Sequence, residues 1–269
     1  MFKPVIVGYA RSPFTMARKG ALIDVKPVNL LSEVVKNLVS KSKINKEDIE
    51  DIVVGCAFQV GEQCFNIGKL VTFLADMNVK TSGMTVDRWC GSSMEAIHIA
   101  SGKIAMGSGK VFICGGVESM SRVNTGFDPV PYPYTEKENP HVYFSMGTTA
   151  ENVAKKFNIL REEQQEFAIS SHNKAHEAQK NGKLSEEIIP IGECKEDGNI
   201  RPNSTQEKLD QFTSHWTPHI IAELNGQAVK IAKIKGDFIW HKHDEEDEMF
   251  WVIKGCMKME LRDQTLTLH

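Results

Sequence analysis

The sequence predicts an α/β protein with a mixed, mostly parallel sheet covered by helices, followed by a small all-β segment at the C-terminus. Short apolar runs alternate with stretches in which apolar residues recur every three or four positions, a pattern typical of strands alternating with amphipathic helices. The apolar runs carry few charges, which is typical of strands buried on both faces of a parallel sheet. Near the C-terminus, short β-like runs follow one another closely, which indicates a separate all-β unit.

Composition limits the classes of function. The chain of 269 residues is 41% hydrophobic and 25% charged, as in ordinary globular proteins. No run approaches the roughly 20 apolar residues that cross a bilayer, and a net charge of −3 gives no electrostatic reason to expect nucleic-acid binding. The N-terminus lacks the pattern of a secretory signal, and the six cysteines lack disulfide or metal spacing. We therefore expect a cytoplasmic protein with reduced thiols and no membrane partner.

Elements are expected in the following order. Strands are expected at residues 5–9, 52–56, 81–89 and 111–114, and helices at 30–39, 91–105 and 161–180. Residues 122–143 are rich in Pro, Tyr and Asn and exceed the usual loop length, which indicates a functional excursion. Thr148 and Glu151 have the spacing of a capping box that opens another helix. The helix at 161–180 ends before Asn181-Gly182, a suitable stop.

Cys90 is the candidate nucleophile. It lies where the strand-like run 81–89 meets the helix-like run that begins at Gly91. The free N–H groups and positive dipole end of a helix N-terminus favour thiolate over thiol, so this position is expected to lower the pKa of the cysteine. The alternative is a small buried apolar residue, which is the state of most free cysteines.

Residues 86–94, Val-Asp-Arg-Trp-Cys-Gly-Ser-Ser-Met, resemble the nucleophile motif of thiolases, enzymes of the acetyl-CoA acetyltransferase group. Residues 117–121, 146–151 and 161–168 fit the same family in the expected order, so the resemblance covers residues 1 to about 201. It implies that Cys90 takes the acyl group of acyl-CoA as a thioester. It also implies that the excursion after Arg122 helps to bind the CoA thioester, that Met146 lies close to the acyl group, and that no cofactor is required.

The resemblance also implies impaired turnover. In thiolases two histidines and a second cysteine come largely from the second half of the chain, which has no counterpart here. His98 lies eight residues beyond Cys90 on one predicted helix, about 12 Å away, and His141 stays open as a base. The resemblance further implies a homo-oligomer, or a complementing chain that supplies the two histidines and the second cysteine.

Turn and linker residues between 194 and 204 predict a domain boundary, which divides residues 1–205 from 206–269. After it, strands are expected at 219–224, 228–234, 238–243, 249–253 and 257–261.

Residues 236–248 resemble the first motif of cupins, and the resemblance covers about 208 to 269 as a partial barrel. Residues two apart on a strand share a face, so His241 and His243 present two imidazoles to one side, and Glu248 can return from the paired strand. This set of ligands suits iron, manganese or zinc. The alternative is a solvated acidic turn beside a chance histidine pair. Three functions therefore stay open: a thiolase-type acyltransferase, a metal-binding cupin-like module, and a non-catalytic fusion of two truncated genes.

Overall fold

The computed structural model describes residues 3–123, 141, 144–202, 219–224, 227–231, 252, 255–260 and 265–268. The chain divides into two compact units, Met1–Gln211 and Phe212–His269, each considered by itself.

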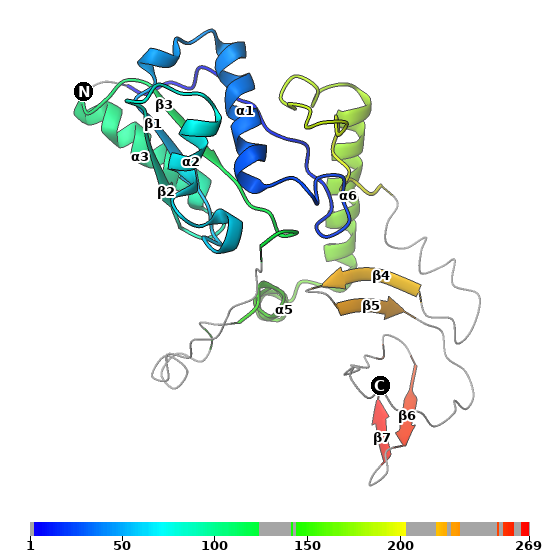
Figure 1. Cartoon of the computed structure of the whole chain (residues 1–269). Coiled ribbons are helices and arrows are strands. Elements are labelled where there is room, and N and C mark those ends of the chain that lie inside the picture. Colours follow the sequence, from blue (N-terminus) through cyan, green and yellow to red (C-terminus); the bar gives the residue numbers. More distant parts are fainter. Residues whose placement is uncertain are drawn as a thin grey trace. The chain divides into compact units, whose positions relative to one another are not determined.

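A three-stranded parallel sheet forms the centre of the first unit (Figure 1). Its strands are β1 (Asp51–Gly55), β2 (Ser82–Val86) and β3 (Phe112–Gly116), in the order β2-β1-β3. β1 is buried along its whole length, as its β-branched centre predicts. Gly55 pairs with both Val86 and Gly116, so the three strands end level and their carboxyl ends form one edge. The predicted parallel sheet is confirmed.

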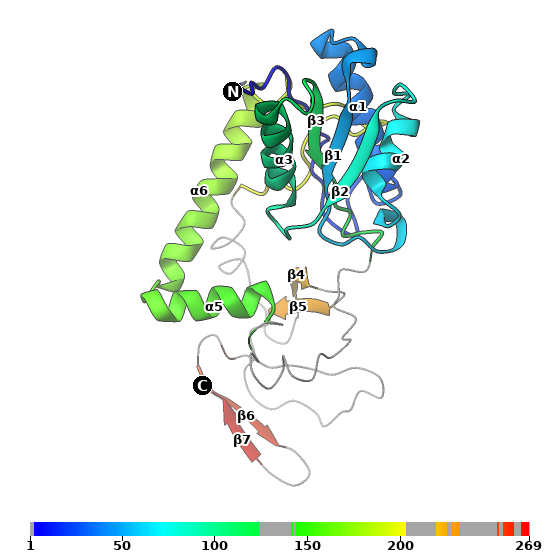
Figure 2. The ribbon, with the colours of Figure 1, turned by 90° about the vertical axis from the view of Figure 1, so that its left-hand side faces the viewer.

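Helices cover both faces of this sheet (Figure 2). α1 (Pro27–Ser42) and α2 (Ile67–Leu74) lie on one face, and α3 (Ser92–Met106) lies on the other. α1 begins with Pro27, whose fixed φ suits a first helical position, and it ends at Lys43 in the left-handed conformation. The core under α1 and α2 is aliphatic: its fully buried members include Ile52, Val54, Ile67 and Val71.

Two further helices follow in the first unit. α5 (Met146–Phe157) begins earlier than predicted, because Ser145 Oγ accepts the Thr148 N–H at 3.1 Å and so caps the helix. The predicted capping box at Thr148 is therefore wrong. α6 (Arg161–Lys180) has the predicted bounds. The Glu163 side chain accepts the Leu160 N–H at 2.7 Å at its start.

The strand predicted at residues 5–9 is wrong. The structure places this run in irregular backbone, and Val5, Ile6 and Val7 are 70 to 80% exposed. An apolar, β-branched run becomes a strand only where a second backbone pairs with its N–H and C=O groups. Among the described residues, that pairing begins after the run, where Arg11 N–H donates to Glu187 O and Ile189 N–H donates to Arg11 O, both at 2.8 Å.

Arg11 also joins the start of the first unit to its end. Its guanidinium donates two hydrogen bonds of 2.8 Å to the Asp197 carboxylate, and its Nε donates to Glu187 at 2.7 Å. The Phe14 N–H donates to Asp197 at 2.7 Å. Asp197 is only 8% exposed, so this is a nearly buried carboxylate with several donors.

The second unit contains two antiparallel hairpins in its described residues. β4 (His219–Leu224) pairs with β5 (Gln227–Ile231), and β6 (Met257–Glu260) pairs with β7 (Thr265–Leu268). Three of the predicted runs correspond to β4, β5 and β6, whereas β7 was not predicted. The runs at 238–243 and 249–253 lie outside the described residues, so the cupin-like barrel stays a prediction.

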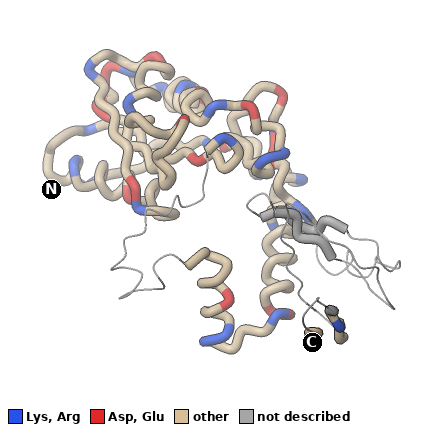
Figure 3. Tube along the Cα trace, turned by 60° about the horizontal axis from the view of Figure 1, so that its bottom comes forward, with Lys and Arg blue, Asp and Glu red and all other residues tan. Residues whose placement is uncertain are grey.

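Lys and Arg residues are interspersed with Asp and Glu residues along the described trace (Figure 3). Within that part of the chain, no helix combines the length and the apolar character needed to cross a membrane.

Candidate active site

Cys90 lies on a short turn between the end of β2 and the start of α3. Hydrogen bonds within the turn fix its shape. The Trp89 N–H donates to Asp87 Oδ1 at 2.8 Å. Ser92 Oγ accepts the Arg88 N–H at 2.8 Å and donates to Trp89 O at 2.6 Å. The turn is thus a defined structure that begins at the carboxyl edge of the sheet.

The thiol of this turn is presented to solvent. Trp89 has a φ of 48°, a left-handed conformation that is uncommon for a bulky residue and that is often found near functional sites. Cys90, the next residue, is exposed. The alternative that Cys90 is a buried packing residue is therefore wrong.

The start of α3 lies directly against the sheet. A Cβ on Gly55 would overlap the backbone of Ser92 and Ser93, and a Cβ on Gly116 would overlap the Ser93 side chain. Gly91, at the N-cap, provides no side-chain cap. The Ser92 N–H donates to Trp89 O at 3.0 Å, and no side chain caps the helix. The N-terminus of a helix stabilises a nearby negative charge.

His98 and His141 each contact another residue. His98 Nδ1 lies 3.7 Å from Glu95 Oε2, and the same carboxylate forms an ion pair with Arg88. The His141 ring stacks edge-to-face on Phe144, with centroids 4.7 Å apart. These contacts leave the base for Cys90 unassigned, and His141 stays a candidate.

Two other cysteines belong to the same sheet: Cys56 follows β1 and accepts a hydrogen bond from Gln63 Nε2 at 3.4 Å, and Cys114 lies within β3. Burial, reinforced by the negative charge of Glu118, raises the pKa of Cys56 to about 11. Burial, together with the charge of Asp51, also raises the pKa of Cys114. Both residues are thiols at neutral pH, in agreement with the prediction that they pack.

The other predicted site residues are not brought to Cys90 by any described contact. Met146 is the first residue of α5 and is 71% exposed. His241, His243 and Glu248 lie outside the described residues. Across the described ranges, no group of three or more His, Cys, Asp or Glu side chains is arranged to hold a metal ion.

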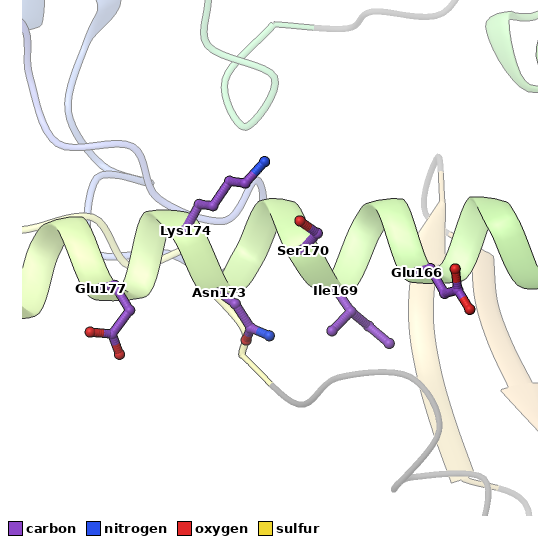
Figure 4. Close-up of a pocket in the computed structure, with 6 residues that line it drawn as sticks. All are labelled: Glu166, Ile169, Ser170, Asn173, Lys174 and Glu177. Atoms are coloured by element: carbon purple, nitrogen blue, oxygen red, sulfur yellow. The ribbon is translucent and has the colours of Figure 1, made fainter.

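A shallow depression lies elsewhere, on α6. It is lined by Glu166, Ile169, Ser170, Asn173, Lys174 and Glu177. Figure 4 shows that all six side chains project from this single helix. A depression with no wall from a second element is an exposed helix surface, so we assign no chemistry to it.

The fold and the turn together define an α/β protein with an exposed cysteine at the carboxyl edge of a parallel sheet, where open α/β sheets bind ligands. The family model described as "Thiolase, N-terminal domain" matches residues 4–218. The chain belongs to the thiolase family, and the family resemblance of the first segment is confirmed.

Known relatives agree with this assignment. The 3-ketoacyl-CoA thiolase of Marinobacter nauticus is 37% identical over 228 residues, which cover 80% of this chain and 57% of that protein. The 3-ketoacyl-CoA thiolase of Bacillus subtilis is 38% identical over 192 residues, covering 71% and 49%. The crystal structure of the Bacillus anthracis acetyl-CoA acetyltransferase aligns with a TM-score of 0.67 and 29% identity, covering 77% and 57%. The chain thus spans about half the length of the relatives it matches.

Proposed function

We propose that the chain carries the nucleophile of a thiolase-type acyltransferase and that Cys90 accepts the acyl group of acyl-CoA. The observation that carries the proposal is the exposed cysteine on the turn before α3, within the region that matches the thiolase family. The names of the relatives, 3-ketoacyl-CoA thiolase and acetyl-CoA acetyltransferase, support a CoA thioester as the substrate.

In the proposed step, the Cys90 sulfur attacks the carbonyl carbon of the thioester. A bond forms between these two atoms, and the bond from the carbonyl carbon to the CoA sulfur breaks. The proton lost by Cys90 is taken up by the leaving CoA thiolate, which leaves CoA as a free thiol. The N-terminus of α3 supports this step because the positive end of a helix is suited to stabilise the oxyanion that forms before the bond breaks. No metal or cofactor is required.

We expect the acylation to be slow and the turnover to be impaired. His98 is held at Glu95 and lies about 12 Å along α3 from Cys90. Among the described residues no contact positions a base at Cys90, and the lack of a positioned base lowers a rate by about 10² to 10⁴-fold. The same proposal places Met146 close to the acyl group. It also includes a second copy of this chain, or a complementing chain, that completes the site. The family resemblance supports both parts.

Acetyl-CoA tests the proposal directly. After incubation with acetyl-CoA, intact-mass measurement is expected to show one added acetyl group, and peptide mapping is expected to place it on Cys90. The Cys90→Ala variant should remain unmodified. Cys64→Ala is the matched control, since Cys64 is also exposed but lies outside the motif, and it should be acetylated like wild type. Acetylation of Cys90→Ala to the wild-type level would contradict the proposal.

Residues 206–269 are proposed as a second domain that binds a divalent metal through His241, His243 and Glu248. The spacing of these residues along the sequence supports this proposal. A protein with neither acetylation nor bound metal would instead match the hypothesis of a non-catalytic fusion.

A further inference from the structure

Gln63 is a polar side chain with no exposed surface, at the end of the short 3-10 helix Gly61–Gln63. Its amide is hydrogen bonded on both sides. Nε2 donates to Phe58 O at 2.8 Å and to Glu118 Oε1. Oε1 accepts the Ser119 N–H at 2.6 Å. A buried amide is retained at little cost only when its donors and acceptor are satisfied in this way.

Glu118 completes the network from the other side. One of its carboxylate oxygens accepts from Gln63, and the other accepts the Ala57 N–H at 2.9 Å. Ala57 and Phe58 follow β1, whereas Glu118 and Ser119 follow β3. The network therefore ties together the loops that leave two neighbouring strands at the carboxyl edge of the sheet.

One of these loops contacts the turn of Cys90. The Phe58 ring packs edge-to-face on the Trp89 ring, with centroids 5.8 Å apart and an interplanar angle of 80°. This geometry is favourable for aromatic pairs. Trp89 holds the left-handed conformation immediately before Cys90. A continuous set of contacts therefore runs from Gln63 and Glu118, through Phe58 and Trp89, to the backbone of the nucleophile.

We propose that Gln63 and Glu118 are positioning residues that hold Phe58 against Trp89 and thereby keep the Cys90 turn in the conformation that reacts with the acyl group. This inference rests on the proposed function of Cys90. Neither residue contacts the cysteine, so both act through the Phe58–Trp89 pair.

The chemistry of the pair suggests the variants. Gln63 must donate toward Phe58 O and Glu118 and accept from Ser119, and an amide provides both capacities. In Gln63→Glu two carboxylates face each other, and Phe58 O loses its donor. In Glu118→Gln the new amide can offer its oxygen to Gln63 or to the Ala57 N–H, and its NH2 group then faces the other donor. The exchange Gln63→Glu with Glu118→Gln restores the bond between the two side chains but leaves Phe58 O without a donor, so it should stay impaired.

The first experiment measures the acetylation rate of Cys90 as a function of acetyl-CoA concentration. Each single variant is expected to lower the saturating rate by about 10 to 100-fold, because small misplacements of a reacting group cost that much. The half-saturating concentration should stay near the wild-type value, and the exchange variant should stay as slow as the Gln63→Glu variant, because Phe58 O still lacks its donor. A loss confined to the half-saturating concentration, or full recovery in the exchange variant, would overturn the proposal.

The second experiment needs no acyl-CoA and separates this inference from the proposed function. Iodoacetamide alkylation of Cys90 is measured by peptide mass spectrometry relative to exposed Cys64 in the same molecule. The ratio is expected to fall about 10-fold in each single variant, and to stay low in the exchange variant because Phe58 O still lacks its donor. If wild-type Cys90 is not acetylated, the proposed function fails, while this ratio still decides the positioning role.

Two further variants serve as controls. Gln164→Glu makes the same change at a half-buried glutamine of α6 whose Nε2 donates to Ile159 O at 3.3 Å, and it should leave the ratio unchanged. Phe58→Leu keeps Gln63 and Glu118 but removes the ring contact with Trp89, and it should lower the ratio as the single variants do. If Gln63→Glu and Glu118→Gln do not fold, Phe58→Leu still decides, because an unchanged ratio in this variant would overturn the proposal.

Discussion

Cys56 and Cys90 follow neighbouring strands, but their surroundings give the two sulfurs different chemistry. Cys56 is 1% exposed, and its pKa is raised to about 11 by burial and by the charge of Glu118. It therefore stays protonated at neutral pH, and a protonated thiol is a poor nucleophile. Cys90 is exposed on the turn before an uncapped helix. At this edge of the sheet, burial decides which cysteine packs and which is available to a substrate.

The Arg11–Asp197 pair predicts a pH dependence at a single residue. Burial acts to raise the pKa of Asp197, but hydrogen bonds from Arg11 and the Phe14 N–H, with the charge of Arg11, outweigh it and lower the pKa. The folded-state pKa lies below the unfolded value of about 4. The contribution to stability is therefore present above about pH 4 and is lost as the pH falls through the folded-state pKa.

We expect Asp197→Asn to lower the free energy of unfolding at pH 7 by about 2 kcal/mol, because it removes charged hydrogen bonds from a nearly buried group. Urea unfolding from pH 7 to pH 3 should show a weaker loss of stability with acid than in wild type. Glu33→Gln is the control, since Glu33 forms an exposed pair with Lys36 and should change stability by less than about 1 kcal/mol. Equal effects of the two substitutions would contradict the assigned role.

At the scale of elements, the contact between β1 and α3 depends on a residue without a side chain. Gly55→Ala would drive a methyl group into the backbone at Ser92 and Ser93. We expect it to destabilise the fold by about 1 to 3 kcal/mol, as overpacking does, and to slow the acetylation of Cys90. Thermal unfolding and intact mass measure the two effects.

Gly102→Ala, in α3, is the control for Gly55→Ala. A Cβ on Gly102 meets no atom within 4 Å, so this variant should gain about 0.5 to 1 kcal/mol from its better helix propensity. Acetylation of Cys90 should be unaffected. If both glycine variants behaved alike, the close approach of α3 to β1 would not be what positions the turn.

The sequence was most informative where a local pattern determines the element. Short apolar runs predicted β1 and β3, and periodicity predicted α1, α3 and α6. Prediction failed where the structure depended on a pairing strand or on which of two similar residues caps a helix. Residues 5–9 have strand propensity but find no described partner, and Ser145 rather than Thr148 caps α5.

The candidate site shows the same limit. Cys90 was identified from a local motif and its place at a helix start. Gln63 and Glu118 were missed because they are 55 residues apart, and only the register of β1 and β3 brings them together. A hydrogen bond between distant residues leaves no spacing pattern in a single sequence.

At the scale of the whole molecule, the metal site proposed in residues 206–269 predicts that the chain binds one ion. We expect elemental analysis of the purified chain, after reconstitution with Fe²⁺, Mn²⁺ or Zn²⁺ and removal of free metal, to find one ion per chain. The triple variant His241→Ala, His243→Ala and Glu248→Ala should lose it. A control that replaces Asp244, Glu245 and Glu246 with alanine should retain the ion, and equal metal content in the two triple variants would rule the site out.

The exposed side chains around the Cys90 turn have a consequence for evolution. Three side chains are exposed by 55, 58 and 44%: Trp89, Met94 and Ile97. The aliphatic core, in contrast, lies between the sheet and the helices α1 and α2. Substitutions at exposed positions usually change stability by less than about 0.5 kcal/mol. Met94 and Ile97 can therefore vary in sequence without eroding the framework that presents the sulfur.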